Sequence, residues 1–279
     1  MPPRSLRALA LVALGLAAAT ARLGAHELYI RPSSFRPAAG ERVALALEVG
    51  HAFTGSPVER RPGHLRRFVW LGAGGEPNDV HGIDGALPAG WLTGVDAGVV
   101  TVSYESEVMR HELPAARFAS YLREEGLEHV LDLRRERGEQ AEPGRELFSR
   151  CAKTVLEVGA ARRTAAVGDA TSRELPVVGC PLELVPDDRL LEPGSGVAVR
   201  VLWEGRPLAG VLVRATRAGD REPSAAARSD AQGLVRVELG AGAWLVHAVH
   251  MTPVTEPSAA PAGDWRSVWA SLTFERPSG

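Results

Sequence analysis

Apolar and polar residues alternate along most of the chain, and glycine and proline interrupt the alternation at short intervals. A period of two places successive side chains on opposite faces of a β-strand, so it predicts strands with one buried face. Clear examples are ELYIRP and RVALALEVG near the start and AGVVTVSYES further on. The pattern therefore predicts a mainly β protein.

One segment departs from this period. Residues 114–137, PAARFASYLREEGLEHVLDLRRER, carry apolar side chains at intervals of three and four on both sides of Gly126. This spacing predicts one broken helix or two short helices packed against a sheet. We interpret the charged residues at 124–125 and 134–137 as a solvated helix face.

The pattern starts afresh after Pro181 and predicts about seven further short strands separated by turn residues. GRPLAGVLVRAT and SDAQGLVRVEL resemble the strand and turn pattern of immunoglobulin- or transthyretin-like modules. We therefore predict two immunoglobulin- or transthyretin-like β-sandwich modules, at 26–178 and 179–279, with the short helical insertion in the first.

The first 25 residues have the layout of a secretory signal peptide: two arginines, an apolar run and then small residues. The run is shorter than the roughly 20 residues of a membrane-spanning helix, and no later stretch qualifies. Cleavage before Arg22 fits the small-x-small rule better, whereas cleavage before His26 would leave a histidine at the terminus. The expectation is a periplasmic or otherwise exported, soluble protein without a transmembrane segment in the mature chain.

The net charge and the absence of catalytic motifs limit the classes of function to which the protein could belong. The formal net charge is −2, so nothing indicates a nucleic-acid partner. The chain contains no HExxH, GxSxG, P-loop or CxxC motif, and we predict no catalytic residues and no enzymatic activity. Two cysteines occur, Cys151 and Cys180, and in an oxidising compartment such a pair predicts a disulfide, because a zinc site needs more ligands.

Histidines are the candidate metal ligands. We interpret four of the eight as surface or helix-edge residues: His64, His81, His111 and His129. His51 directly follows a predicted strand, where both binding sites and ordinary turns occur. If the mature chain begins at His26, an α-amino group and an imidazole share one residue, and together they form a strong metal chelate.

His247 and His250 lie three residues apart in WLVHAVHM, which is predicted to be a strand. Residues three apart in a strand point to opposite faces, so without a bulge both cannot bind one ion. One of the two can be a ligand, and the alternation does not say which.

Several segments in order, among them AHELYIRPSSFRPAAGERVALALEVGHAF, FASYLREEGLEHVLDLRRERGE, GRELFSRCAKTVLEVG and WLVHAVHM, resemble an exported bacterial family described as a domain of unknown function. Some members are described as the periplasmic component of nickel/cobalt uptake systems of the ABC or energy-coupling type. The resemblance implies a mature start at or next to His26. It favours His250 over His247, because the family often has arginine at the latter position. The two cysteines are a local addition, since the family usually has other residues there.

These observations lead to one hypothesis for the site. We predict that His26, with its amino group, His51 and His250 bind a divalent transition metal ion, with His247 and Met251 as additional candidates. Amine and imidazole ligands suit Ni²⁺, Co²⁺, Cu²⁺ and Zn²⁺, and copper binds most tightly at equal geometry. The expected function is a periplasmic metal-binding protein, with nickel or cobalt favoured, accessory to a membrane-embedded metal transporter.

Two alternatives remain open at this point. The protein could be a structural or interaction β-sandwich module of the cell envelope in which the histidines are incidental. It could also be a copper-binding protein in which an N-terminal histidine and a second histidine form a brace for oxidative chemistry. Metal titration separates the first alternative from the metal hypothesis, and the paramagnetic resonance of a copper-loaded sample tests the second.

Overall fold

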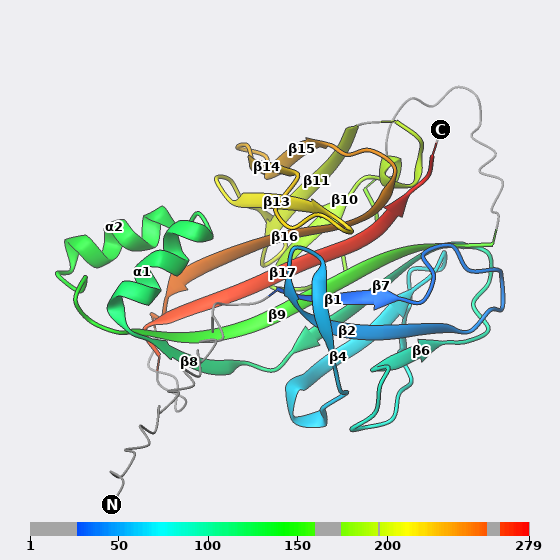
Figure 1. Ribbon diagram of the computed structural model, residues 1–279, viewed down its shortest axis with the longest axis horizontal. Coiled ribbons are helices and arrows are strands. Elements are labelled where there is room, and N and C mark those ends of the chain that lie inside the picture. Colours follow the sequence, from blue (N-terminus) through cyan, green and yellow to red (C-terminus); the bar gives the residue numbers. More distant parts are fainter. Residues whose placement is uncertain (1–26, 160–173, 195, 256–262, 279) are drawn as a thin grey trace, which may run out of the picture.

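A computed structural model of the protein describes residues 27–159, 174–194, 196–255 and 263–278. The expected signal peptide, both expected cleavage sites and His26 lie outside the described residues. The strands and helices are shown in Figure 1. The strands are β1 (Glu27–Pro32), β2 (Val43–His51), β3 (Thr54–Val58), β4 (Leu65–Leu71), β5 (Pro77–Asp79), β6 (Gly90–Leu92), β7 (Gly98–Ser106), β8 (Met109–Leu113), β9 (Gly144–Val158), β10 (Leu182–Pro186), β11 (Gly196–Trp203), β12 (Arg206–Pro207), β13 (Leu212–Arg217), β14 (Ala225–Arg228), β15 (Leu234–Glu238), β16 (Gly242–Pro253) and β17 (Trp265–Arg276). The helices are α1 (Ala115–Glu124) and α2 (Glu128–Glu136), with two short 3₁₀ turns at Pro62–His64 and Asp188–Leu191.

One large sheet runs through the whole molecule. Its order is β14-β13-β16-β17-β9-β7-β4-β5, and β8 also pairs with β9. Two smaller sheets accompany it: β1-β2-β3 with β6, and β10-β11-β12 with β15. The parallel pairing of β9 with β17 joins strands from the two expected modules, and Figure 1 shows these two long strands side by side in the middle of the molecule. The two expected modules therefore share one continuous sheet.

The smaller sheets cover opposite faces of the large sheet. On β9, Ala152 and Leu156 pack into one core with Ile30 of β1. Lys153 points to the other face, where its ammonium group donates to Glu183 of β10 at 2.7 Å. Because successive strand residues alternate between faces, β9 contributes to both layers. The mainly β fold with sandwich packing and a helical insertion is confirmed, while the boundary at residue 178 stays a prediction.

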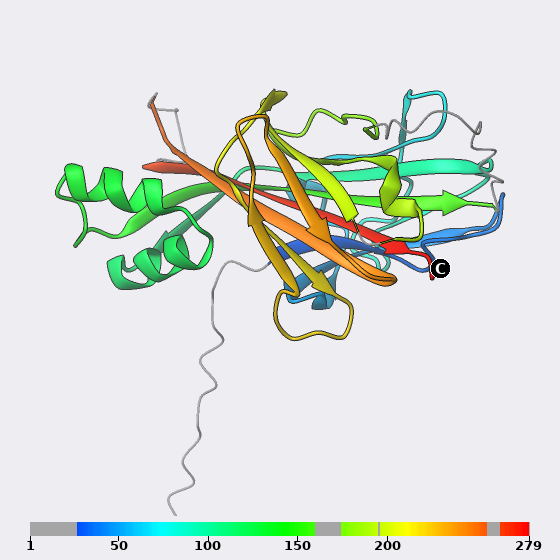
Figure 2. The same cartoon turned by 90° about the horizontal axis from the view of Figure 1, so that it is seen from above.

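The predicted helical segment forms two short helices. Gly126 separates them with a φ of +68°, a conformation that favours glycine. A Cβ atom at this position would lie 2.8 Å from Leu212, so glycine also permits contact with β13. The helices pack on Met251 of β16 and Trp265 of β17, at one end of the long strands (Figures 1 and 2). No helix among the described residues is long and apolar enough to cross a membrane.

The interpretation of the charged helix residues as a solvated face is wrong at one position on α2. The side chain of Arg134 is buried, and the residue is only 3% exposed. Its guanidinium group donates to the carbonyl oxygens of Glu139 and Glu142 and lies 5.0 Å from the centre of the Phe118 ring. Helix periodicity alone does not reveal this role, because the carbonyl acceptors come from the loop that follows.

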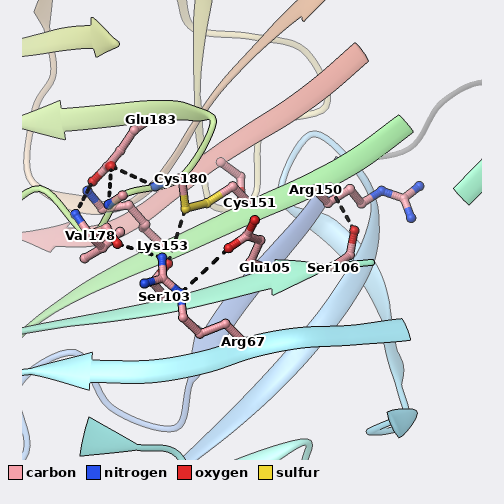
Figure 3. The surroundings of a disulfide bond; sticks show 12 residues. Arg67, Ser103, Glu105, Ser106, Arg150, Cys151, Lys153, Val178, Cys180 and Glu183 are labelled. Carbon is pink, nitrogen blue, oxygen red and sulfur yellow. Dashed lines mark hydrogen bonds and ion pairs between the residues drawn. A yellow bond between two sulfur atoms is a disulfide. The ribbon is translucent and has the colours of Figure 1, made fainter. Parts of the chain in front are cut away.

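The predicted disulfide between Cys151 and Cys180 is present (Figure 3). It connects β9 to the segment that leads into β10, and the two Cα atoms are 6.2 Å apart. The cysteines are 29 positions apart in sequence, so in the chain-entropy model the bond stabilises the fold by about 3–4 kcal/mol. The disulfide thus fixes the second small sheet to the large one.

Candidate functional site

A tight turn between β2 and β3 presents His51. The two residues of the turn, Ala52 and Phe53, have φ values of 50° and 55°. Two-residue hairpins of this kind usually contain Asn-Gly, because L-residues with side chains pay roughly 1–2 kcal/mol each for a left-handed conformation. Such strain persists only where surrounding contacts impose it, and it occurs most often at functional sites.

Contacts of Phe53 and the close approach of the backbone at Gly50 hold the turn in this conformation. Phe53 is 2% exposed, and its ring meets the edge of Tyr29 at a centroid distance of 5.2 Å. Arg31 donates to the carbonyl oxygen of Phe53 at 2.7 Å and lies 4.2 Å from the centre of that ring. A Cβ atom at Gly50 would lie 2.2 Å from the carbonyl oxygen of Thr54, so this close approach of β2 and β3 requires glycine. The position of His51 is therefore fixed by its neighbours.

Two hydroxyl groups of β17 hold β1 against the large sheet. Ser271 donates to the carbonyl oxygen of Leu28 at 2.7 Å, and Thr273 donates to that of Ile30 at 2.6 Å. Ser271 is also the cross-strand partner of His247 on β16. The first residue of β1, Glu27, is consequently placed beside His247.

Two histidine side chains, His51 and His247, meet at the carboxylate of Glu27. Its carboxylate lies 3.4 Å from Nδ1 of His51 and 3.5 Å from Nδ1 of His247. On the other side of the His247 ring, Nε2 lies 3.9 Å from Oε2 of Glu125. The side chain of His247 is 6% exposed and that of Glu27 is 9% exposed, whereas that of His51 is 55% exposed. The cluster is thus buried at Glu27 and His247 and reaches solvent at His51.

The buried imidazole of His247 is incompletely satisfied. Its Nδ1 atom is buried and makes no hydrogen bond to any residue that the structure describes. Most buried polar atoms have a partner, and leaving one without costs about 1–3 kcal/mol. The Nδ1 atom of His247 therefore faces the Glu27 carboxylate at 3.5 Å without a hydrogen bond to a described residue.

The electrostatics of the cluster favour a cation. Burial alone would raise the pKa of Glu27, but the contact with His51 and the charges of His247 and His51 together lower it below its ordinary value. Glu27 is therefore ionised at neutral pH. The same contact, opposed by partial burial, raises the pKa of His51, and Glu125 and Glu124 contribute to this increase.

Glu125 is itself held in place. It forms the C-terminal cap of α1, and its Oε2 atom accepts a hydrogen bond from Nη1 of Arg214 at 2.8 Å. Its side chain is 13% exposed. Arg214 is the partner of His247 in the pairing of β13 with β16. The expectation that Glu125 belongs to a solvated helix face is therefore wrong, while Glu124 is exposed as expected.

His250 lies apart from this cluster. The centre of its ring lies 4.7 Å from that of Trp203 in an edge-to-face arrangement and 5.7 Å from that of His129 in a stacked one. His250 therefore lies on the face of β16 opposite His247. The side chain of Met251 is fully buried against the helices. The structure thus brings His51 and His247 together at Glu27 and does not bring His250 to them. Within the described ranges, no three His, Cys, Asp or Glu side chains are grouped so that they could hold a metal ion by themselves.

The position of His250 leads to a prediction about acid stability. Burial, followed by the charge of His129, lowers the pKa of His250 to about 4. An unfolded histidine takes up a proton near pH 6.5, so the unfolded state gains protons first as the pH falls, and the free energy of unfolding decreases. Between pH 7 and pH 5 this residue is expected to remove about 1–2 kcal/mol of stability. Urea denaturation of the wild type and of His250→Gln measures it, and an equal loss in both proteins would refute the assignment.

Sequence reasoning missed two residues of the cluster. Glu27 follows His26 directly, and Glu125 directly precedes the glycine that ends α1. Neither position carries a distinctive motif, because each acquires its role from strands and turns distant in sequence. A search for acidic residues next to the candidate histidines would have found Glu27 alone.

Comparison with curated proteins gives no match. Among solved structures, the human OSCAR ligand-binding domain is 14% identical, with 89% of this chain and 97% of that chain covered and a TM-score of 0.20. The D0-D1 domain of intimin (12% identity, 89% and 97% covered, TM-score 0.19) and murine CEACAM1b (11%, 90% and 100%, 0.20) are comparable. At these TM-scores the similarities carry no inference about fold or function.

Comparison with protein families gives a more extensive match. Residues 23–252 match the family described as "Domain of unknown function (DUF4198)". The matched range contains β1, the turn after β2, both helices and His247, and thus every side chain of the cluster around Glu27. The chain therefore belongs to the DUF4198 family.

Proposed function

We propose that this protein binds a divalent transition metal ion at a site to which Glu27, His51 and His247 contribute ligands and which a further ligand completes. The observation that carries the proposal is the buried Nδ1 atom of His247, which faces the Glu27 carboxylate at 3.5 Å and makes no hydrogen bond to a residue in the described part of the chain. The imidazole of His51 reaches the same carboxylate from the strained turn. Two imidazoles and a carboxylate are ligand types that suit nickel, cobalt, copper and zinc.

The terminal residue of the expected mature chain would complete the ligand set. His26 is bonded to Glu27, and a peptide unit spans about 3.8 Å between Cα atoms. A chain that starts at His26 would bring an α-amino group and a third imidazole within reach of the cluster. This replaces His250, which the sequence analysis favoured, by His247, because His247 shares the face of β16 that carries β1.

The sequence resemblance to periplasmic components of nickel/cobalt uptake systems supports nickel or cobalt as the metal. In this proposal the metal is cargo, and the protein is exported and accessory to a membrane-embedded transporter. The exposed His51 at the mouth of the cluster is consistent with exchange of an ion with solvent or with a partner. A carboxylate between two imidazoles, with the carboxylate of Glu125 on the other side of His247, would attract cations to this position.

Isothermal titration tests the proposal. Purified protein that starts at His26 is titrated with Ni²⁺, Co²⁺ and Cu²⁺, and we expect saturable binding of one ion per chain. A matched protein with one extra glycine before His26 keeps every side chain and displaces the amine, and we expect it to bind at least about tenfold more weakly, a difference of about 1.4 kcal/mol. Absence of binding heat with all three metals would refute the proposal and leave the cluster as a structural contact between β1 and β16.

A further inference from the structure

His247 lies between two carboxylates that play different parts. Nδ1 faces Glu27, where His51 also converges, while Nε2 faces Glu125 at 3.9 Å. A neutral imidazole carries its proton on one nitrogen and a lone pair on the other. The side on which the proton resides therefore decides which nitrogen can bind an ion.

Glu125 is well placed to keep the imidazole proton of His247 on Nε2, the nitrogen that faces it. Arg214 fixes its Oε2 atom at 2.8 Å, and the side chains of both residues are mostly buried, at 13% and 17% exposed. The exposed Glu124 next to it has no such contact among the described residues. Metal-binding histidines commonly donate their second ring N–H to a carboxylate, which selects the tautomer and orients the ring.

We propose that Glu125, held by Arg214, positions His247 so that Nε2 carries the proton and Nδ1 offers its lone pair to a cation beside Glu27. The inference rests on the proposed metal site and adds a residue that does not itself bind the ion. At 3.9 Å, beyond hydrogen-bond distance, the carboxylate acts on the Nε2–H group through its charge.

Two variants separate this role from a general effect of charge. Glu125→Gln removes the carboxylate and nearly keeps the shape of the side chain. Glu124→Gln removes the same charge one residue earlier, at an exposed position of α1. In titrations with Ni²⁺ we expect Glu125→Gln to lose about 10- to 100-fold in affinity, as is typical for residues that support a metal ligand. We expect Glu124→Gln to remain within about threefold of wild type, as an exposed charge in high dielectric contributes little.

The tautomer provides a readout that a purely structural role would not change. In ¹⁵N-labelled protein loaded with diamagnetic Zn²⁺, two-bond ¹⁵N–¹H correlation spectra distinguish a metal-bound Nδ1 with Nε2–H from the reverse arrangement. We expect the first pattern for His247. The reverse pattern, or a Ni²⁺ affinity of Glu125→Gln within threefold of wild type, would overturn the inference while leaving the metal site intact. A wild-type protein that binds no metal would overturn the proposed function, and this inference with it.

Discussion

Replacement of His247 by alanine is expected to lower the affinity for Ni²⁺ by at least about 100-fold, or about 2.7 kcal/mol, whereas replacement of His250 leaves it within about threefold. His247 is buried between Glu27 and Glu125, so its removal takes away a proposed ligand and leaves two carboxylates facing a cavity. His250 lies on the same strand three residues later, on the opposite face. The two variants therefore remove the same side chain from the same strand and differ in the face that it occupies.

Calorimetric titration with Ni²⁺ measures both affinities. Circular dichroism and thermal unfolding of the two variants show whether each is folded at the temperature of the titration. If His250→Ala loses affinity and His247→Ala does not, the ion binds beside His129 and Trp203, and the site proposed at Glu27 is refuted. If neither variant loses affinity, the ion binds elsewhere on the chain.

A large effect on stability is expected from Lys153→Met. Lys153 is the single lysine of the chain and is 1% exposed, and its ammonium group lies 2.7 Å from Oε1 of Glu183, which is equally buried. Figure 3 shows the pair beside the disulfide. Lys153 belongs to β9 and Glu183 to β10. Removal of one partner of a buried ion pair leaves an uncompensated charge, which typically costs about 3–5 kcal/mol. We expect a loss of this size in the free energy of unfolding.

Glu183 has further hydrogen-bond partners besides Lys153. Its two carboxylate oxygens accept hydrogen bonds from the backbone N–H groups of Val178, Gly179 and Cys180 at 2.8–3.1 Å. The carboxylate thus organises the turn that carries one cysteine of the disulfide. Burial lowers the pKa of Lys153, and the charge of Glu183 opposes this effect.

Urea denaturation of Lys153→Met, of Glu183→Gln and of the double variant tests the role of the pair. In the double variant Lys153→Met/Glu183→Gln, no unpaired charge remains, so its loss should be smaller than the sum of the two single losses. As a control, Arg135→Gln breaks an exposed ion pair with Asp132, where both side chains are more than half exposed, and less than about 1 kcal/mol is expected. A loss below about 1 kcal/mol for Lys153→Met would show that the buried pair contributes no more than a surface pair.

Local patterns predicted the elements well. The alternation of apolar and polar residues identified β1, β2 and β7. The apolar spacing of three and four residues identified the two helices on either side of Gly126. The count of two cysteines was sufficient for the disulfide. These features depend on residues close in sequence or on elimination among few possibilities. For that reason they are readable without knowledge of the fold.

The shared sheet was not predictable in the same way. At the centre of the sheet, β17 pairs in parallel with β9, and Trp265 lies opposite Glu146. Most of the second expected module separates these two residues in sequence. Nothing in the alternation of either strand indicates its partner. The choice between His247 and His250 as a ligand was open for the same reason, because alternation shows that they occupy opposite faces but not which face carries β1. The hydrogen bond from Ser271 to β1 shows which face that is, and the identity of the ligand stays a prediction.

Anomalous diffraction from crystals soaked with Ni²⁺, recorded on both sides of the nickel absorption edge, tests the central claim most directly. We expect one strong peak within about 2.3 Å of a ring nitrogen of both His51 and His247, on the side of His247 that faces Glu27. A peak between His129 and His250, or no peak near Glu27 at a nickel concentration that saturates the protein in solution, would contradict it.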